Sequence, residues 1–168
     1  MHDNGGSGGG LKQDAERLWR TDNTARLFLH AFNTFEEKLL LRAAAAGAGD
    51  IRRVHLNVLR HIDVKGTRMA DLAQRAGITN GAMSQAVALC QRDGLVEIKT
   101  DPDDKRARRV YFTPDGLTLL ETLHQLFLGI EQEISDIVGE DGFAELRRLL
   151  GLLQRDFNVS AGEIKARG

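Results

Sequence analysis

The chain has 168 residues, of which 42% are hydrophobic, and a formal net charge of -1 at pH 7. This length allows one hydrophobic core, or a compact domain whose outer helices pair with a second copy. A single cysteine, Cys90, excludes an internal disulfide framework and a Cys-based zinc site, and no apolar run approaches the roughly 18 residues of a membrane span. We therefore expect a soluble, cytoplasmic protein with no cofactor and no bound metal.

Positive charge is concentrated in the middle of the chain. Between residues 51 and 113, Lys and Arg number twelve and Asp and Glu number seven, whereas the rest of the chain is net acidic. A basic middle with acidic flanks is typical of a segment that binds a polyanion. The alternative is an ordinary solvated surface, and charge alone leaves both open.

The N-terminal third contains a glycine-rich tail and a helical pattern. Residues 1–10 hold five glycines and no large aliphatic side chain beyond Met1, so we expect them to be disordered. From Leu11 to about Ala46, apolar residues recur at steps of three and four, which predicts one long helix. A shorter apolar stripe over residues 54–62 predicts a second helix.

Two short helices follow with a brief connection. Thr67 is the expected N-cap of a helix over residues 69–76, which Gly77 ends. Thr79 is the expected N-cap of a helix over residues 80–92, ended by the Asp-Gly pair that comes next. The three-residue connection between them is typical of a helix-turn-helix.

The helix over residues 80–92 has two distinct faces. Its large apolar residues occur at core spacing, and the opposite face is small and polar. Such a face fits against base edges in the major groove, while the alternative is a solvent-exposed surface on a helix that only packs. The inward set is Met83, Ala86, Val87 and Cys90, and the outward set is Gly81, Ser84, Gln85 and Ala88.

A charged β-hairpin is predicted directly after this helix. The β-rich runs LVEIK and RRVYF are separated by TDPDDKRA, so the order of elements is that of a winged helix. Asp104 lies two residues before Arg106, and we expect it to orient that guanidinium for a narrow minor groove, with Lys105 and Arg108 near phosphates. The alternative is an ion pair that only stiffens a surface turn.

The C-terminal part is again helical. Thr113 is an expected N-cap with Pro114 at the first helical position, and apolar residues continue at helical spacing over residues 117–137 and 143–157. A small winged helix cannot cover so much apolar length at both ends of the chain. A second subunit is therefore the expected cover.

Residues 51–116 resemble the MarR-type winged helix-turn-helix regulators. The resemblance lies in VLRHIDVKGTRMADLAQRAGITNGAMSQAVALCQRDGLV and in DPDDKRARRVYFTPDG, whose D-P-x-D-x-R and V-x-F-T-x-x-G patterns are the specific part. It implies a homodimer on a palindromic operator, with the N- and C-terminal helices in the dimer interface. It also implies release by a small aromatic acid or other phenolic ligand.

Three positions depart from the family pattern. Cys90 stands where a core Leu is usual, Gln85 where Arg is common, and Ile98 where Arg often follows the GLV turn. Gln pairs best with adenine, so Gln85 favours adenine over guanine at its base pair.

The predicted fold is mainly α with a small β-hairpin (α+β). Its parts are a disordered tail (1–10), an N-terminal dimerisation helix (11–50), a winged helix-turn-helix (51–113) and C-terminal dimerisation helices (114–168). The predicted function is a homodimeric, sequence-specific double-stranded DNA-binding regulator, a repressor relieved by ligand. The alternative is a winged-helix protein-interaction module without an operator. Catalysis is not expected, because the chain has no Gly-rich phosphate loop or nucleophile elbow and His55 and His61 lie six residues apart.

The remaining predictions concern individual residues. His30 and His124 are expected to be interfacial or packed residues rather than ligands, and Cys90 to be a buried, inert thiol rather than a redox sensor. Trp19, with Arg20 and Arg26, is a candidate stacking surface and carboxylate clamp for an effector, although dimer packing is the commoner use of such a Trp. The predicted DNA contacts are Thr67, Arg68, Arg75, Asn80, Gly81, Ser84, Gln85, Lys105, Arg106 and Arg108, and the candidate effector residues are Trp19, Arg20, Arg26 and His61.

Overall fold

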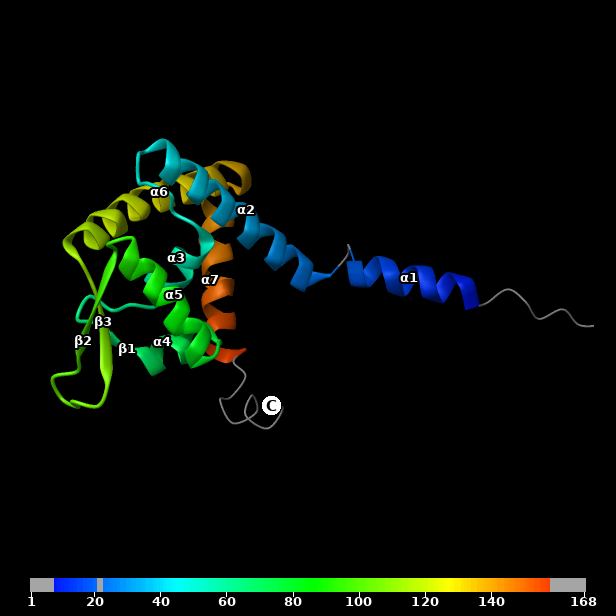
Figure 1. Cartoon of the computed structure of the whole chain (residues 1–168). Helices are drawn as coiled ribbons and strands as arrows, with labels where there is room; N and C mark the ends of the chain where they lie inside the picture. Colours follow the sequence, from blue (N-terminus) through cyan, green and yellow to red (C-terminus); the bar gives the residue numbers. More distant parts are fainter. Residues whose placement is uncertain (1–7, 21–22, 158–168) are drawn as a thin grey trace, which may run out of the picture. The chain divides into compact units, whose positions relative to one another are not determined.

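A computed structural model describes residues 8–20 and 23–157 of the chain. It is mainly helical with one small antiparallel sheet, as predicted (Figure 1). The backbone forms two compact units, one up to residue 124 and one from residue 125 onward. The elements are α1 (Gly8–Arg20), α2 (Thr24–Ala45), α3 (Arg53–Leu59), β1 (Thr67–Arg68), α4 (Met69–Ala76), α5 (Asn80–Arg92), β2 (Val96–Thr100), β3 (Arg108–Phe112), α6 (Pro114–Val138) and α7 (Glu140–Asp156).

The N-terminal segment contains two helices, so the prediction of one long helix was wrong. Asn23 caps α2, because its side-chain oxygen accepts the backbone N–H of Arg26 at 2.9 Å. Its side-chain amide also donates to the backbone oxygens of Leu18 and Trp19 near the end of α1. Most of the predicted disordered tail lies outside the described residues, but its last three residues, 8–10, are helical in α1.

The helix-turn-helix forms where the sequence predicted it. Helix α4 ends at Gly77, whose φ of 66° is the left-handed conformation that glycine adopts without strain. Helix α5 begins after Thr79, whose hydroxyl accepts the backbone N–H of Ala82 at 3.2 Å. These two local signals place α5 at the predicted residues, 80–92.

The predicted hairpin is confirmed, and a third short strand joins it. Strands β2 and β3 pair antiparallel, with Val96 opposite Phe112 and Thr100 opposite Arg108. Strand β1 pairs with the other edge of β3, which gives the order β1-β3-β2. Next to β1, a Cβ on Gly66 would lie 2.4 Å from the Tyr111 ring, and its φ is 82°, so this turn requires glycine.

Apolar side chains from α3, α4, α5 and the sheet form the core of the first unit. A buried core of this kind holds α5 firmly against the sheet, which fixes where its outward face points. The core residues include Leu56, Val58, Leu59, Leu72, Ala73, Met83, Val87, Cys90, Val96, Val110 and Phe112.

The second unit contains the later part of α6 and all of α7. The two helices are separated at Gly139, which lies at the break that the sequence predicted. Within this unit, Arg147 donates to Glu131 at 2.8 Å and lies over the Phe143 ring. Among the helices of the described residues, none combines the length and the hydrophobicity that a membrane crossing needs.

Candidate nucleic-acid interface

Helix α5 presents the outward face that the sequence predicted. Met83, Val87 and Cys90 are buried, whereas Gly81, Ser84, Gln85 and Ala88 are exposed. The helix therefore buries its large side chains and offers short, polar ones. Its N-terminal Asn80 is exposed as well.

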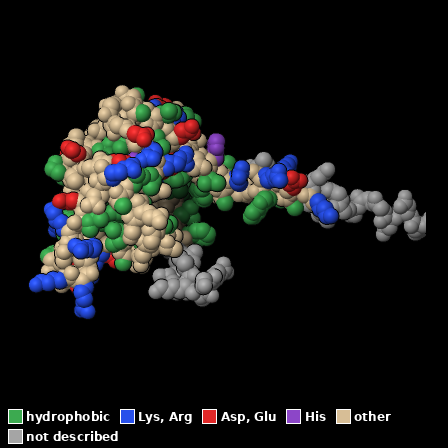
Figure 2. All heavy atoms as spheres, in the orientation of Figure 1, with side chains coloured by type: hydrophobic (Ala, Val, Ile, Leu, Met, Phe, Trp, Pro, Cys, Tyr) green, Lys and Arg blue, Asp and Glu red, His purple; other side chains and the backbone are tan. Residues whose placement is uncertain are grey.

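The start of α5 and the β-sheet face the same open hollow. From α5, Asn80 and Ser84 line it, and from the sheet, Arg68, Ile98 and Arg108 do so. The first turn of α4 and Ala107 of the wing loop complete the lining. Helix α5 and the hairpin are thus presented on one side of the molecule, which is the arrangement that groove binding requires. Figure 2 shows Lys and Arg side chains (blue) projecting from the hairpin end.

A buried carboxylate organises the base of the wing, by which we mean residues 96–112. Asp101 is only 1% exposed, and its Oδ2 accepts from Arg68 Nε at 2.7 Å and from Arg109 Nη2 at 3.0 Å. Its Oδ1 accepts the backbone N–H of Asp103 at 2.9 Å. The Arg68 guanidinium above all, together with the Asp103 amide and Arg109, holds the pKa of the Asp101 carboxyl well below its usual range. Asp101 therefore ties β1 and β3 to the wing loop.

The tip of the wing is held through its backbone. Asp104 Oδ1 accepts the backbone N–H of Arg106 at 3.0 Å, which forms a local turn. The same oxygen lies 3.9 Å from Arg106 Nε, too far for a hydrogen bond, and the Arg106 side chain is 97% exposed. Asp104 thus sets the position of the Arg106 backbone and leaves its guanidinium extended into solvent. Lys105 is exposed beside it, and Arg108 donates to Thr100 Oγ1.

Thr67 and Arg75, two of the predicted DNA-contact residues, make contacts with the turn before α4. Thr67 is buried, and its hydroxyl accepts the backbone N–H of Asp63 and donates to the Asp63 carboxylate, so it is not the N-cap of α4. Arg68 occupies the N-cap position instead, without a side-chain cap. Arg75 donates to the Asp63 carboxylate and to the backbone oxygen of His61, both at 2.9 Å. Thr67 and Arg75 brace the turn before α4.

The candidate effector residues are only partly brought together. Trp19 and Arg26 line one open, mostly apolar hollow where α1 meets α2, and the Trp19 side chain is 81% exposed. Arg20 is paired with Glu16, and His61 is not among the residues that line this hollow. Partial burial, with Arg60 and Arg75 nearby, lowers the pKa of His61.

The histidines differ in burial, and the cysteine is buried. His55 is buried and contacts Asp93. His30 and His124 are exposed, so neither is packed within the chain, and their place in an interface stays a prediction. Cys90 is buried, as expected from sequence, and burial raises the pKa of its thiol to about 11. Over residues 8–20 and 23–157, no group of three or more His, Cys, Asp or Glu side chains is placed to hold a metal ion.

The roles of Asp101 and Arg109 in this site were not predicted from the sequence. Asp101 is the acceptor for arginines that lie 33 and 8 residues away, so its role depends on the pairing of three strands. The only local signal is its position directly before Pro102 at the end of a β-rich run. Arg109 carried no predicted role. Alternation along β3 places it with Tyr111 on the face opposite the core residues Val110 and Phe112, and on that face its guanidinium binds Asp101.

Comparison with known proteins agrees with this fold. The sequence model of the MarR family matches residues 50–107, which include the helix-turn-helix, β2 and the wing loop. The reduced form of MarR from E. coli is 25% identical, with a TM-score of 0.66 over 78% of this chain and 96% of that one. No curated protein matches the sequence.

Two similar structures contain DNA. A cysteine-to-serine mutant of E. coli MarR complexed with operator DNA is 24% identical, with a TM-score of 0.64 over 77% of this chain and 91% of that chain. Sco3205, a MarR family transcriptional regulator from Streptomyces coelicolor in complex with DNA, is 21% identical, with a TM-score of 0.62 over 81% of this chain and 87% of that chain. At these identities the likeness establishes the fold.

Proposed function

We propose that this chain, whose residues 50–107 belong to the MarR family of winged-helix regulators, controls transcription by binding double-stranded DNA as a homodimer. Members of this family are transcription regulators and not enzymes. The observation that carries the proposal is the hollow shared by the start of α5 and the base of the wing. It gives one face on which a helix and a basic hairpin meet the same duplex.

In the proposed complex, α5 lies in the major groove. Ser84 and Gln85 are exposed, uncharged and able both to donate and to accept hydrogen bonds, and Gly81 allows close approach to the duplex. Gln85 forms paired hydrogen bonds with an adenine. Asn80, at the first turn of the helix, contacts the backbone or the adjoining base edge.

The wing supplies most of the positive charge. Arg106 extends from the tip into the minor groove, where negative potential is concentrated when the groove is narrow. Lys105 and Arg108 contact phosphates on either side, and Arg68 contacts the backbone from the base of the wing. Arg75 pairs with Asp63 but keeps 44% of its side chain exposed, so it adds a further phosphate contact, whereas Thr67 is buried and only holds the turn before α4.

The homodimer is proposed from the apolar surface of the terminal helices. In a monomer these side chains would remain in water, and a second copy is the commonest way to cover such a surface. A two-fold axis would place two α5 helices on half-sites about 34 Å apart and would make the operator palindromic. The exposed large apolar residues include Leu18, Leu27, Phe28, Leu29, Phe32 and Leu41 near the N-terminus, and Phe127, Leu128, Ile137, Val138, Leu146, Leu149, Leu150, Leu153 and Phe157 near the C-terminus.

Repression relieved by a small ligand completes the proposal. An aromatic or phenolic acid would stack on Trp19 and pair its carboxylate with Arg26, since both residues line the hollow between α1 and α2. Ligand binding would favour a spacing of the two α5 helices that no longer matches the half-sites.

The test is a salt titration on duplexes selected from the source genome. Fragments retained by the chain would be sequenced, and the affinity for one of them would be measured between about 50 and 200 mM salt. With three or four phosphate contacts per subunit, we expect log affinity to fall linearly with log salt with a slope of about -5 to -7. An affinity that ignores salt, or no retained fragment, would contradict the proposal and favour a protein-interaction module. Sedimentation of the DNA-free chain tests the homodimer.

A further inference from the structure

The short helix α3 is held by polar contacts on two sides. On one side it meets α2, and on the other it meets the C-terminal end of α5. Between these contacts, Leu56, Val58 and Leu59 are buried in the core. A short helix whose inner face is packed in this way moves as one body, because protein interiors leave little room for independent adjustment.

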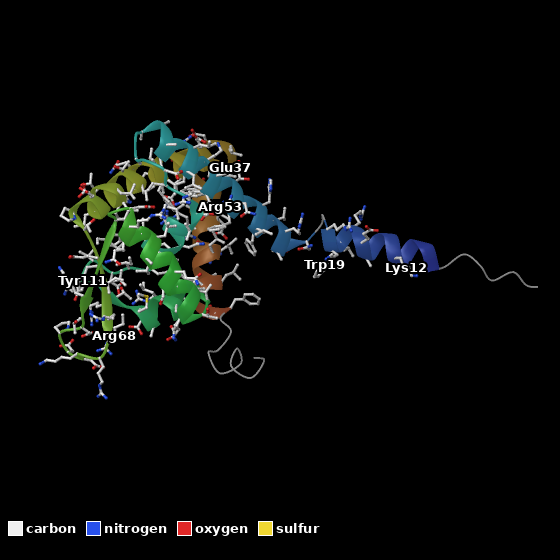
Figure 3. All side chains as sticks on the ribbon, in the orientation of Figure 1. Lys12, Trp19, Glu37, Arg53, Arg68 and Tyr111 are labelled. Carbon is white, nitrogen blue, oxygen red and sulfur yellow. The ribbon has the colours of Figure 1, made fainter. Side chains whose placement is uncertain are left out.

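The contact with α2 centres on a buried carboxylate. Glu36 is 5% exposed, and its Oε2 lies 3.3 Å from Arg53 Nη1, at the first residue of α3. Its Oε1 pairs with Arg60 Nη2, at the C-cap of α3. One carboxylate of α2 therefore binds both ends of α3. Figure 3 marks Arg53 at this junction and Glu37 on the same turn of α2.

The rest of α2 strengthens this contact. The Arg60 guanidinium lies 5.4 Å from the centre of the Phe32 ring, one helical turn before Glu36. Arg53 also donates to Asn33 Oδ1 at 3.3 Å. Since Phe32, Asn33 and Glu36 share one face of α2, this face is fitted to both ends of α3.

The contact with α5 is made by a buried histidine. His55 Nδ1 accepts the backbone N–H of Arg52 at 3.0 Å, which leaves the ring proton on Nε2. Nε2 then donates to Asp93 Oδ2, also at 3.0 Å. Asp93 is the C-cap residue of α5, so α3 holds the helix that we place in the major groove by its far end.

We propose that α3 is a rigid link that fixes the position of α5 relative to α2, and that Glu36 is the positioning residue on which the link depends. This inference rests on the proposed function, in which α2 belongs to the dimer interface and α5 reads DNA. A dimer that binds two half-sites needs both α5 helices at one spacing, whereas a single half-site needs only one helix. Loosening the link therefore weakens binding to a full site and spares binding to a half-site.

The test compares Glu36→Gln with Glu37→Gln. Both variants remove one negative charge from the same turn of α2, but Glu37 is exposed. The probes are a selected full-site duplex and a duplex that carries one of its half-sites. For Glu36→Gln we expect full-site affinity to fall about 5- to 20-fold while half-site affinity stays within about twofold. Glu37→Gln should change neither.

Amide hydrogen exchange of the DNA-free chain gives a second readout that needs no operator. Glu36→Gln should speed exchange in α3 and leave the paired amides of β2 and β3 unchanged. Equal loss on both duplexes, or exchange in α3 like that of Glu37→Gln, would overturn the proposal. If the wild type binds no duplex, the proposed function fails. Amide exchange in α3 then tests by itself whether Glu36 holds α3. If Glu36→Gln does not fold, Arg53→Gln breaks the same contact from its half-exposed side.

Discussion

The outward face of α5 is polar and uncharged, whereas the wing, which borders the same hollow, is rich in basic side chains. Between Asn80 and Gln91, α5 has no charged residue, whereas the wing carries Lys and Arg at its tip and its base. Short polar side chains act over hydrogen-bond distances and depend on the base they meet, while charges act on any phosphate backbone. The proposed complex thus separates its tasks, with discrimination from α5 and most of the affinity from the wing.

The wing itself is divided in the same way. Its base is held together by Asp101, a buried carboxylate that binds both Arg68 and Arg109 and leaves one positive charge unbalanced. Its tip is solvated, and Arg106 is fixed only through its backbone. The base therefore provides stability and direction, and the tip provides the charge that is free to bind.

Replacing Asp101 should have the largest effect. Asp101→Ala leaves Arg68 and Arg109 without their shared acceptor, so we expect affinity to fall on the order of 100-fold on every duplex and the chain to unfold at lower urea concentration. Asp103→Ala is the matched control, because Asp103 is exposed and contributes only its backbone N–H to Asp101. Similar losses in both variants would show that the base of the wing has no special role.

The stability that Asp101 contributes should depend on pH. Because the pKa of Asp101 is lowered in the folded state, its contribution to stability is present above about pH 4 and is lost as the pH falls below that value. The difference in urea midpoint between wild type and Asp101→Ala should therefore shrink between pH 7 and pH 3. A constant difference would contradict the charge-based role of Asp101.

Arg106→Ala should weaken DNA binding by about 1–3 kcal/mol without changing stability. Its side chain is almost fully exposed and makes no hydrogen bond that stabilises the fold. The loss should be greatest on operators with an A·T-rich centre, where the minor groove is narrow. Lys105→Ala provides the comparison, since a lost phosphate contact weakens all duplexes alike and lowers the salt slope by about 1. If Arg106→Ala binds DNA with the affinity of the wild type, Arg106 makes no energetically important contact with DNA.

The sequence predicted the elements whose ends are marked locally. Thr79 and the Asp-Gly pair mark α5, and the turn residues mark the hairpin, so both were found. The prediction of one helix joined the apolar steps on either side of residues 20–24, although these five residues are all polar and include the cap Asn23. Strand β1 has only two residues and exists through its pairing with β3.

Only part of the candidate site was predicted from the sequence. The exposed set on α5 and the exposed tip of the wing follow from helical spacing and turn chemistry, and both lie as expected. Thr67 and Arg75 were chosen by residue type, but their partner Asp63 lies in a turn whose shape no local pattern indicates. Asp101 was missed because its arginine partners come from two other strands.

Gln85→Ala should have a smaller and more selective effect. Loss of paired hydrogen bonds should cost about 1–2 kcal/mol on the preferred operator and nothing on a duplex with that base pair changed, since only discrimination is lost. The salt slope should stay as in the wild type, because Gln85 carries no charge. Gln91→Ala removes the same side chain near the other end of α5 and serves as the control. A uniform loss on all duplexes would mean that α5 does not read bases.

The smallest effect is expected at the one cysteine, which lies on the inward side of α5. With a pKa of about 11, roughly one Cys90 thiol in a thousand is ionised at pH 8, and the side chain is inaccessible. A disulfide reagent should therefore label the native chain only as fast as it unfolds, and label the urea-unfolded chain at once. Oxidant should leave DNA affinity unchanged. Rapid labelling of the native chain, with loss of affinity, would instead make α5 redox-sensitive, and its role would no longer be limited to reading bases.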